Sequence, residues 1–200
     1  QKIDYIDYEA MLEFSILGAK VLHYRAVEIA MKYNVAIKVL SSFDQVAGTD
    51  IAQYKENNME QIKLTGIAHN DKIALVELAA SPKAMTADLV SALLEKNINV
   101  ISIVSFDDKV ALIVSLIDLI QVKEILADCK IVYKVHTEIA LVSLVGIGIN
   151  NDLRIVHKVL TFISNAQHLN VSTTKISFIV KLPDLEAVIK ILHAQLFEYL

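Results

Sequence analysis

The hydrophobic and polar positions of this 200-residue chain follow helical spacing in some segments and strand-like spacing in others. Between residues 8 and 33, apolar residues recur at helical spacing on either side of Gly18, which predicts two helices. Residues 34–43 are typical of a short strand after a turn. Residues 52–61 are mostly polar and predict a linker between two parts of the chain.

A regular series of strands and helices is predicted after this linker, and it begins with a strand at 62–70. The order strand, helix, strand, strand, helix, strand then occurs once, and it starts again near residue 138. The predicted elements are 72–80, 84–96, 97–105, 109–117, 118–129 and 130–135 in the first pass, and 138–148, 152–164, 168–172, 175–181 and 183–200 in the second.

The two passes form an internal repeat of about 65 residues. Each has the order βαββαβ, which makes a four-stranded antiparallel sheet with two helices on one face, the ferredoxin-like arrangement. The second pass ends in a helix and lacks its fourth strand, whereas the strand at 62–69 is not needed by the first. Because an unpaired apolar edge invites aggregation, we predict that residues 62–69 complete the second sheet. The predicted fold class is α+β.

Composition and charge argue against several classes of function. The 23 acidic and 19 basic residues give a net charge of −4, and no basic tract suggests a nucleic-acid partner. The longest strongly apolar stretch without charge, residues 139–151, is too short to span a membrane as a helix. One cysteine, Cys129, excludes an internal disulfide framework and fits a reducing compartment. The six histidines are scattered singly and predict no metal site.

The residues from Met11 to Thr49 resemble the segment that closes the kinase domain of aspartokinases. They include LGAKVLHYRAVEIA, SSF and GT, where the usual form is close to LGAKVLHPRAVELA followed by SSF and GT. The two repeats resemble the paired ACT units of that family, with LTGIAHN, NINV, VSLVGIGI, KIS and LHAQL at the expected places. The resemblance covers essentially the whole chain.

This resemblance implies three parts. Residues 1–52 correspond to the C-terminal edge of the amino-acid kinase domain and a linker, residues 70–136 to the first ACT domain, and residues 62–69 with 137–200 to the second. The sequence opens at Gln1 without an initiator Met, so we expect it to be part of a longer protein.

The resemblance also implies a function. Aspartokinases transfer the γ-phosphoryl group of Mg-ATP to L-aspartate, giving 4-phospho-L-aspartate, the first step toward lysine, threonine, methionine and diaminopimelate. Their ACT pair senses an end-product amino acid, commonly lysine or threonine, and mediates dimerisation. The family's KFGG-like opening and glycine-rich phosphate loop do not occur in this sequence. We therefore expect this chain to be inactive by itself, to need no cofactor and to act on its own kinase domain.

The effector-binding residues carried over from the family are few and partly altered. The family turn D-x-P-G-x-A corresponds to Ser81–Thr86, which gives Ser81, Lys83, Ala84 and Met85 as candidates, together with Asn99 in NINV and Ser105, where the family often has Gln. Ser81 replaces Asp and Ala84 replaces Gly. A charge-assisted hydrogen bond lost to a neutral one costs about 1–2 kcal/mol.

The second unit departs further, since GIGINNDLRIV has neither Pro nor Gly at its turn. Here Asp152 or Asn151 is the expected N-cap of the following helix. Two alternatives to a working sensor stay open: a scaffold with eroded effector pockets that serves only dimerisation and stability, and a separate regulatory subunit.

Overall fold

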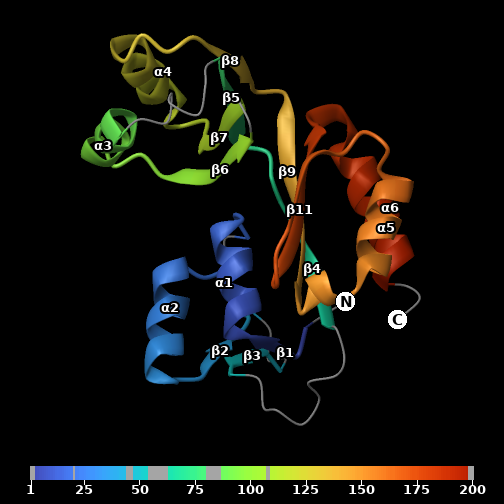
Figure 1. Ribbon diagram of the computed structural model, residues 1–200. Coiled ribbons are helices and arrows are strands. Elements are labelled where there is room, and N and C mark those ends of the chain that lie inside the picture. The colour runs from blue at the N-terminus through green and yellow to red at the C-terminus, as the bar shows by residue number, and fades with distance from the viewer. Residues whose placement is uncertain are drawn as a thin grey trace. The chain divides into compact units, whose positions relative to one another are not determined.

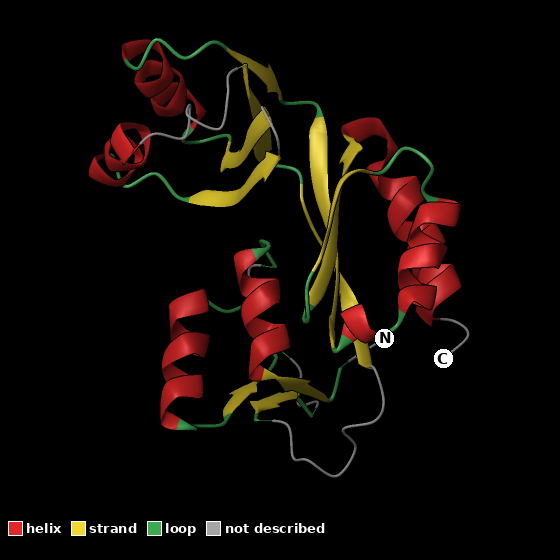
Figure 2. Ribbon diagram, viewed as in Figure 1, coloured by secondary structure: helices red, strands yellow, loops and turns green. Residues whose placement is uncertain are grey.

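The computed structural model describes residues 3–19, 21–43, 47–53, 63–79, 87–106 and 109–197 (Figures 1 and 2). Contacts divide the chain into two compact units. One contains Asp71–Ala140 with Lys181–Pro183, and the other contains Gln1–Asn70, Leu141–Val180 and Asp184–Leu200. Within the described ranges, no helix combines the length and the apolar character needed to cross a lipid bilayer.

The unit around Asp71–Ala140 is the first ferredoxin-like copy. Its elements are β5 (Ile73–Ala79), α3 (Ala87–Glu95), β6 (Val100–Phe106), β7 (Lys109–Ser115), α4 (Leu119–Asp128) and β8 (Tyr133–His136). The strands form an antiparallel sheet in the order β6-β7-β5-β8. Alternate residues of β5, such as Ala74 and Val76, enter a buried core with Leu89 of α3 and Leu126 of α4. Both helices therefore cover one face of the sheet.

The second copy has the same order of elements. They are β9 (Ile139–Ile147), a 3-10 turn (Ile149–Asn151), α5 (Leu153–Phe162), β10 (Gln167–Val171), β11 (Lys175–Lys181), a second 3-10 turn (Leu182–Asp184) and α6 (Leu185–Phe197). Its sheet order is β10-β11-β9-β4, and β4 (Lys63–Asn70) lies antiparallel to β9 with Asn70 opposite Leu141. The prediction that the early strand completes the second sheet is confirmed.

The N-terminal segment has β1 (Tyr5–Asp7), α1 (Tyr8–Ile16), α2 (Tyr24–Tyr33), β2 (Ile37–Val39) and β3 (Thr49–Ala52). The three strands form a small sheet in the order β1-β3-β2. Both helices and β2 agree with the sequence prediction. The sequence pattern did not predict β1 or β3, and the predicted linker overlaps β3 at Ala52; its residues 54–61 lie outside the described part of the chain.

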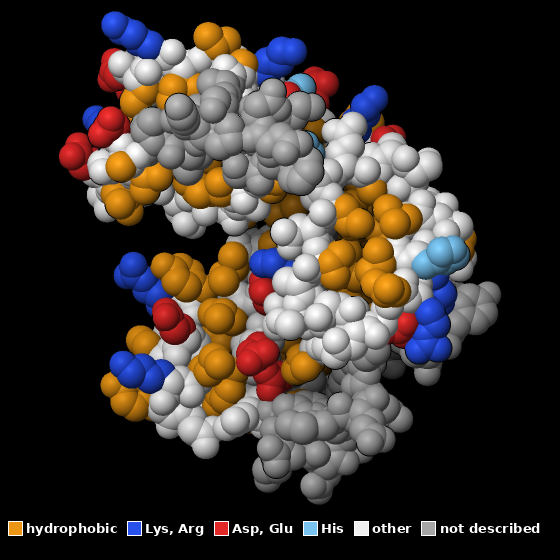
Figure 3. Space-filling model, viewed as in Figure 1, with side chains coloured by type: hydrophobic (Ala, Val, Ile, Leu, Met, Phe, Trp, Pro, Cys, Tyr) orange, Lys and Arg blue, Asp and Glu red, His pale blue; other side chains and the backbone are white. Residues whose placement is uncertain are grey.

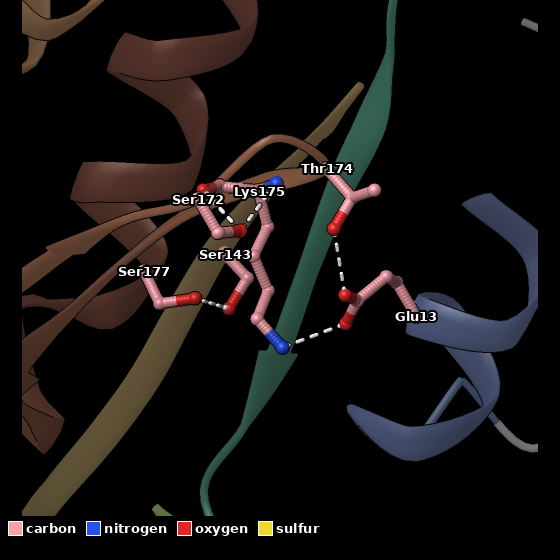
Figure 4. A network of polar contacts seen from close by, with 6 residues as sticks. All are labelled: Glu13, Ser143, Ser172, Thr174, Lys175 and Ser177. Atoms are coloured by element: carbon pink, nitrogen blue, oxygen red, sulfur yellow. Dashed lines mark hydrogen bonds and ion pairs between the residues drawn. The ribbon is translucent and has the colours of Figure 1, made fainter. Parts of the chain in front are cut away.

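Helix α1 packs on the face of the second sheet that α5 and α6 leave open (Figures 1 and 4). Its Phe14 lies so close to Gly66 of β4 that a Cβ atom on Gly66 would be 2.8 Å from Phe14 Cζ. At the end of α1, a Cβ on Gly18 would be 3.9 Å from the Asn70 side chain. The second sheet is thus covered by helices on both faces.

Asp152 begins α5 in the way the sequence predicts. Its Oδ1 accepts a hydrogen bond from the Arg154 backbone N–H at 2.9 Å, and the Arg154 guanidinium donates to both carboxylate oxygens at 2.8 Å. These hydrogen bonds, led by those from the Arg154 side chain, lower the pKa of Asp152 below its ordinary value. The Asp152 side chain is therefore both a helix cap and an ion-pair partner.

Replacing Gly66 with Val is expected to destabilise the unit that contains the second sheet by about 1–3 kcal/mol, because the new side chain overlaps the Phe14 ring. Urea denaturation gives the free energy of unfolding. Phe14→Leu shortens the opposing side chain, so Gly66→Val should cost less in that background. An equal cost in both backgrounds would show that Phe14 is not the obstacle.

Asp152→Ala should lower the free energy of unfolding by about 1 kcal/mol at neutral pH, because α5 loses its N-cap. Since the folded state depresses the Asp152 pKa, this contribution is present at neutral pH and decreases as the pH falls through the depressed value. Thermal unfolding at several pH values measures it. Asp152→Asn is the control, because Asn also caps helices and should retain most of the stability.

Candidate effector site

The structure describes only some of the effector residues taken from the family. Ser81, Lys83, Ala84 and Met85 fall in residues 80–86, between β5 and α3, which lie outside the described ranges. Asn99 is described and exposed, directly before β6. The Ser105 backbone is in β6, opposite Val110 of β7.

The strand register places Asn99 and Ser105 at opposite ends of β6. Ser105, Val110, Leu78 and Tyr133 form one row across the four strands. That row is at the end where β5 finishes and the 80–86 segment begins. Asn99 precedes Ser105 by six residues, which in a strand is about 20 Å. One small amino acid cannot touch both residues within a single copy.

The corresponding turn of the second copy is closed by its own hydrogen bonds. Gly148 has φ of 68°, and its N–H donates to the Thr173 carbonyl at 2.8 Å. Asn151 N–H donates back to the Gly148 carbonyl at 2.9 Å, and the Asp152 carboxylate is engaged by Arg154. The described contacts therefore favour helix capping over ligand binding at this turn.

A polar network joins α1 to the face of the second sheet opposite α5 and α6, and the sequence did not predict it (Figure 4). Glu13 of α1 accepts a hydrogen bond from Thr174 Oγ1 at 2.8 Å through Oε1, and its Oε2 lies 2.7 Å from Lys175 Nζ. Beside it, Ser143 of β9 and Ser177 of β11 are buried and share a hydrogen bond of 2.8 Å. One sequence signal was present: the repeat reads IALVEL at Ile73–Leu78 but IALVSL at Ile139–Leu144.

Hydrophobic side chains are exposed on both units and on the N-terminal helices. The space-filling view shows them gathered over α1 and α2 (Figure 3). On the first unit they lie along the β6 edge and the adjoining helix, at Ile103, Val90 and Leu94. Such uncovered apolar surface is typical of interfaces.

Comparisons with known proteins give a consistent result over the whole chain, although no family model matches it. An aspartate kinase of Pseudomonas fluorescens (strain SBW25) is 30% identical over 96% of the chain and 51% of the relative. The structure of E. coli aspartokinase III in complex with aspartate and ADP (R-state) matches with a TM-score of 0.85 and 25% identity over 98% of this chain and 47% of that one.

A third match concerns the two ferredoxin-like copies alone. The ligand-free regulatory subunit of aspartate kinase from Thermus thermophilus has a TM-score of 0.60 at 23% identity, and the match covers 66% of this chain and 98% of the subunit. The chain spans about half the length of the curated relatives it matches. From its sequence and its fold, this chain belongs to the aspartokinase family, and its two ferredoxin-like copies have the fold of that regulatory subunit.

Proposed function

We propose that this chain is the regulatory region of an aspartokinase, where it binds an end-product amino acid and mediates dimerisation. The enzyme would transfer the γ-phosphoryl group of Mg-ATP to L-aspartate in the cytoplasm. The observation that carries the proposal is the match to E. coli aspartokinase III over 98% of the chain, which includes the N-terminal segment as well as both ACT units.

The exposed apolar surface of the N-terminal segment indicates that another domain packs against it. In α2, only Val27 and Ala30 are buried, while Tyr24, Ile29, Met31 and Tyr33 leave apolar surface exposed on both sides of them. We propose that the rest of the kinase domain covers this surface, and that residues 1–52 are the edge of that domain. In this proposal Mg-ATP and aspartate bind outside the chain, and the chain alone is inactive.

The β6 edge is the better candidate for joining two copies of the chain. From Val100 to Phe106 it has no charged residue, and Ile103 is 51% exposed. Such an edge is open to strand addition. The matching edge of the second sheet, β10, has a register shift near its start, as β6 does between Val100 and Ser102, and in addition a left-handed residue, His168, with φ of 51°. Irregularities of this kind protect an edge from pairing.

A two-fold β6–β6 pairing would also bring together Asn99 and Ser105, which are far apart within one copy. Antiparallel pairing about the middle of β6 places Asn99 of one copy beside the Ser105 end of its partner. We propose that the effector, lysine or threonine, binds there, between Asn99 of one copy and the Ser105 end of β6 in the other. A site of this kind exists only in the dimer.

A separate regulatory subunit is the second candidate, favoured by the near-complete coverage of the Thermus thermophilus subunit. In both cases the ACT pair is the sensor. A scaffold with eroded pockets would also form the dimer but would not bind an amino acid.

Ile103→Lys is expected to raise the dimer dissociation constant roughly tenfold or more, because a lysine on the edge strand opposes strand addition. Sedimentation equilibrium measures the dissociation constant. Val171→Lys makes the matched change on the β10 edge, where the side chain is also partly exposed, and should leave the dimer intact. If Val171→Lys dissociates the dimer and Ile103→Lys does not, the proposed edge is wrong.

Calorimetric titration with lysine, threonine and methionine should give heat with lysine or threonine. Asn99→Ala should weaken that binding about tenfold, as expected for one lost hydrogen bond. Asn170→Ala, an exposed asparagine on β10, is the control and should bind normally. Because the proposed site is shared, Ile103→Lys should also lose binding. Silence with all three amino acids in a dimeric protein would support the scaffold.

A further inference from the structure

The attachment of α1 to the second sheet has an unusual composition for a helix packed on a sheet. The helix buries Tyr8, Ala10 and Met11, which lie N-terminal to the residues that face the sheet. Toward the sheet it presents Glu13 and Phe14. Glu13 is joined to Thr174 and Lys175 at the start of β11, and Phe14 lies over the bare backbone of Gly66.

The sheet surface beneath α1 has a polar row, which is flanked on the same face by the buried apolar side chains of Val145 and Ile179. Ala68, Ser143 and Ser177 form a row across β4, β9 and β11, between the contact of Phe14 with Gly66 and that of Gly18 with Asn70. The two hydroxyls bond to each other, so neither depends on α1 for a partner.

The first copy shows that this surface is specific to the second. By the repeat, Ser143 takes the place of Glu77, whose carboxylate faces His136 at 3.3 Å and is partly exposed. Ser143 removes a charge at the position that α1 covers. The second sheet thus has a neutral hydroxyl where the first sheet has a carboxylate.

Both charged partners remain within reach of water. The Glu13 side chain is 17% exposed and the Lys175 side chain is 27% exposed. When such a pair separates, each charge can be hydrated, whereas a fully buried pair would leave uncompensated charges. Separation of Glu13 from Lys175 therefore leaves no buried, unpaired charge.

We infer that Glu13, Thr174 and Lys175 form a polar latch, which holds α1 on the sheet and lets it detach while the sheet and α5 and α6 stay folded. The latch follows from the packing of this unit and does not require the proposed function. Any role in passing a signal from the ACT pair to the N-terminal segment does rest on that function.

Thiol labelling can test the latch in the whole chain, in a Cys129→Ser background. Ser177→Cys places a near-isosteric thiol under α1, and Val180→Cys places one on the opposite face of the same strand, in the core. When Glu13→Gln is added, the thiol at position 177 should react with a disulfide reagent about tenfold faster, and the rate for the thiol at position 180 should not change. Glu9→Gln removes a charge from an exposed position of the same helix and should leave both rates unchanged.

Two further measurements complete the test. Lys175→Met should reproduce the effect of Glu13→Gln, and the double variant should add nothing to either one. Raised salt should accelerate labelling at position 177 in the chain with an intact latch, which keeps the test valid if Glu13→Gln fails to fold. An unchanged labelling rate at position 177 would overturn the latch. A parallel rise at positions 177 and 180 would show that α1 opens only with the whole unit, which also contradicts it.

Discussion

The pairing of β4 with β9 is the contact on which the architecture depends. The second copy supplies only β9, β10 and β11, and its sheet is complete because β4 adds its fourth strand. β4 precedes the first copy in the chain, so the second copy cannot form its sheet from its own contiguous residues. The same strand contains Gly66, and the Phe14 ring packs over its backbone. One strand thus links the N-terminal segment, the second sheet and, through the chain at Asp71, the first copy.

The two copies keep the same fold but differ where a ligand or a helix would approach. The turn of the second copy is filled by its own groups, with Asp152 bound to Arg154 and Gly148 bound to Thr173. On the sheet face opposite α5 and α6, the second copy has the uncharged Ser143, and α1 packs there. The first copy keeps a charge at Glu77 and an uncharged edge at β6. In the proposed function, the second copy packs against the N-terminal helix and the first copy binds the effector.

The sequence alone was sufficient for the elements with strong local patterns. The repeat, the strand order and the vacancy filled by β4 all follow from apolar spacing within each copy. It was insufficient for β1 and β3, which are short and whose partners, such as Tyr5 and Asp50, lie far apart in the chain. The contact of Glu13 with Thr174 spans 161 residues, and no local pattern encodes a contact of that kind. The separation of Asn99 from Ser105 became visible only when the register of β6 was known.

A site shared by two β6 edges would couple ligand binding to association. If the effector touches Asn99 of one copy and the Ser105 end of another, it binds the dimer and not the monomer. Linkage then requires that the effector stabilise the dimer by the same factor by which dimerisation strengthens binding. In such a dimer the β6 edges would hold the two halves of the site together before the ligand arrives, so each contact with the ligand would have less ordering to achieve. The uncharged edge of β6 would then matter as much to ligand affinity as the residues that touch the ligand.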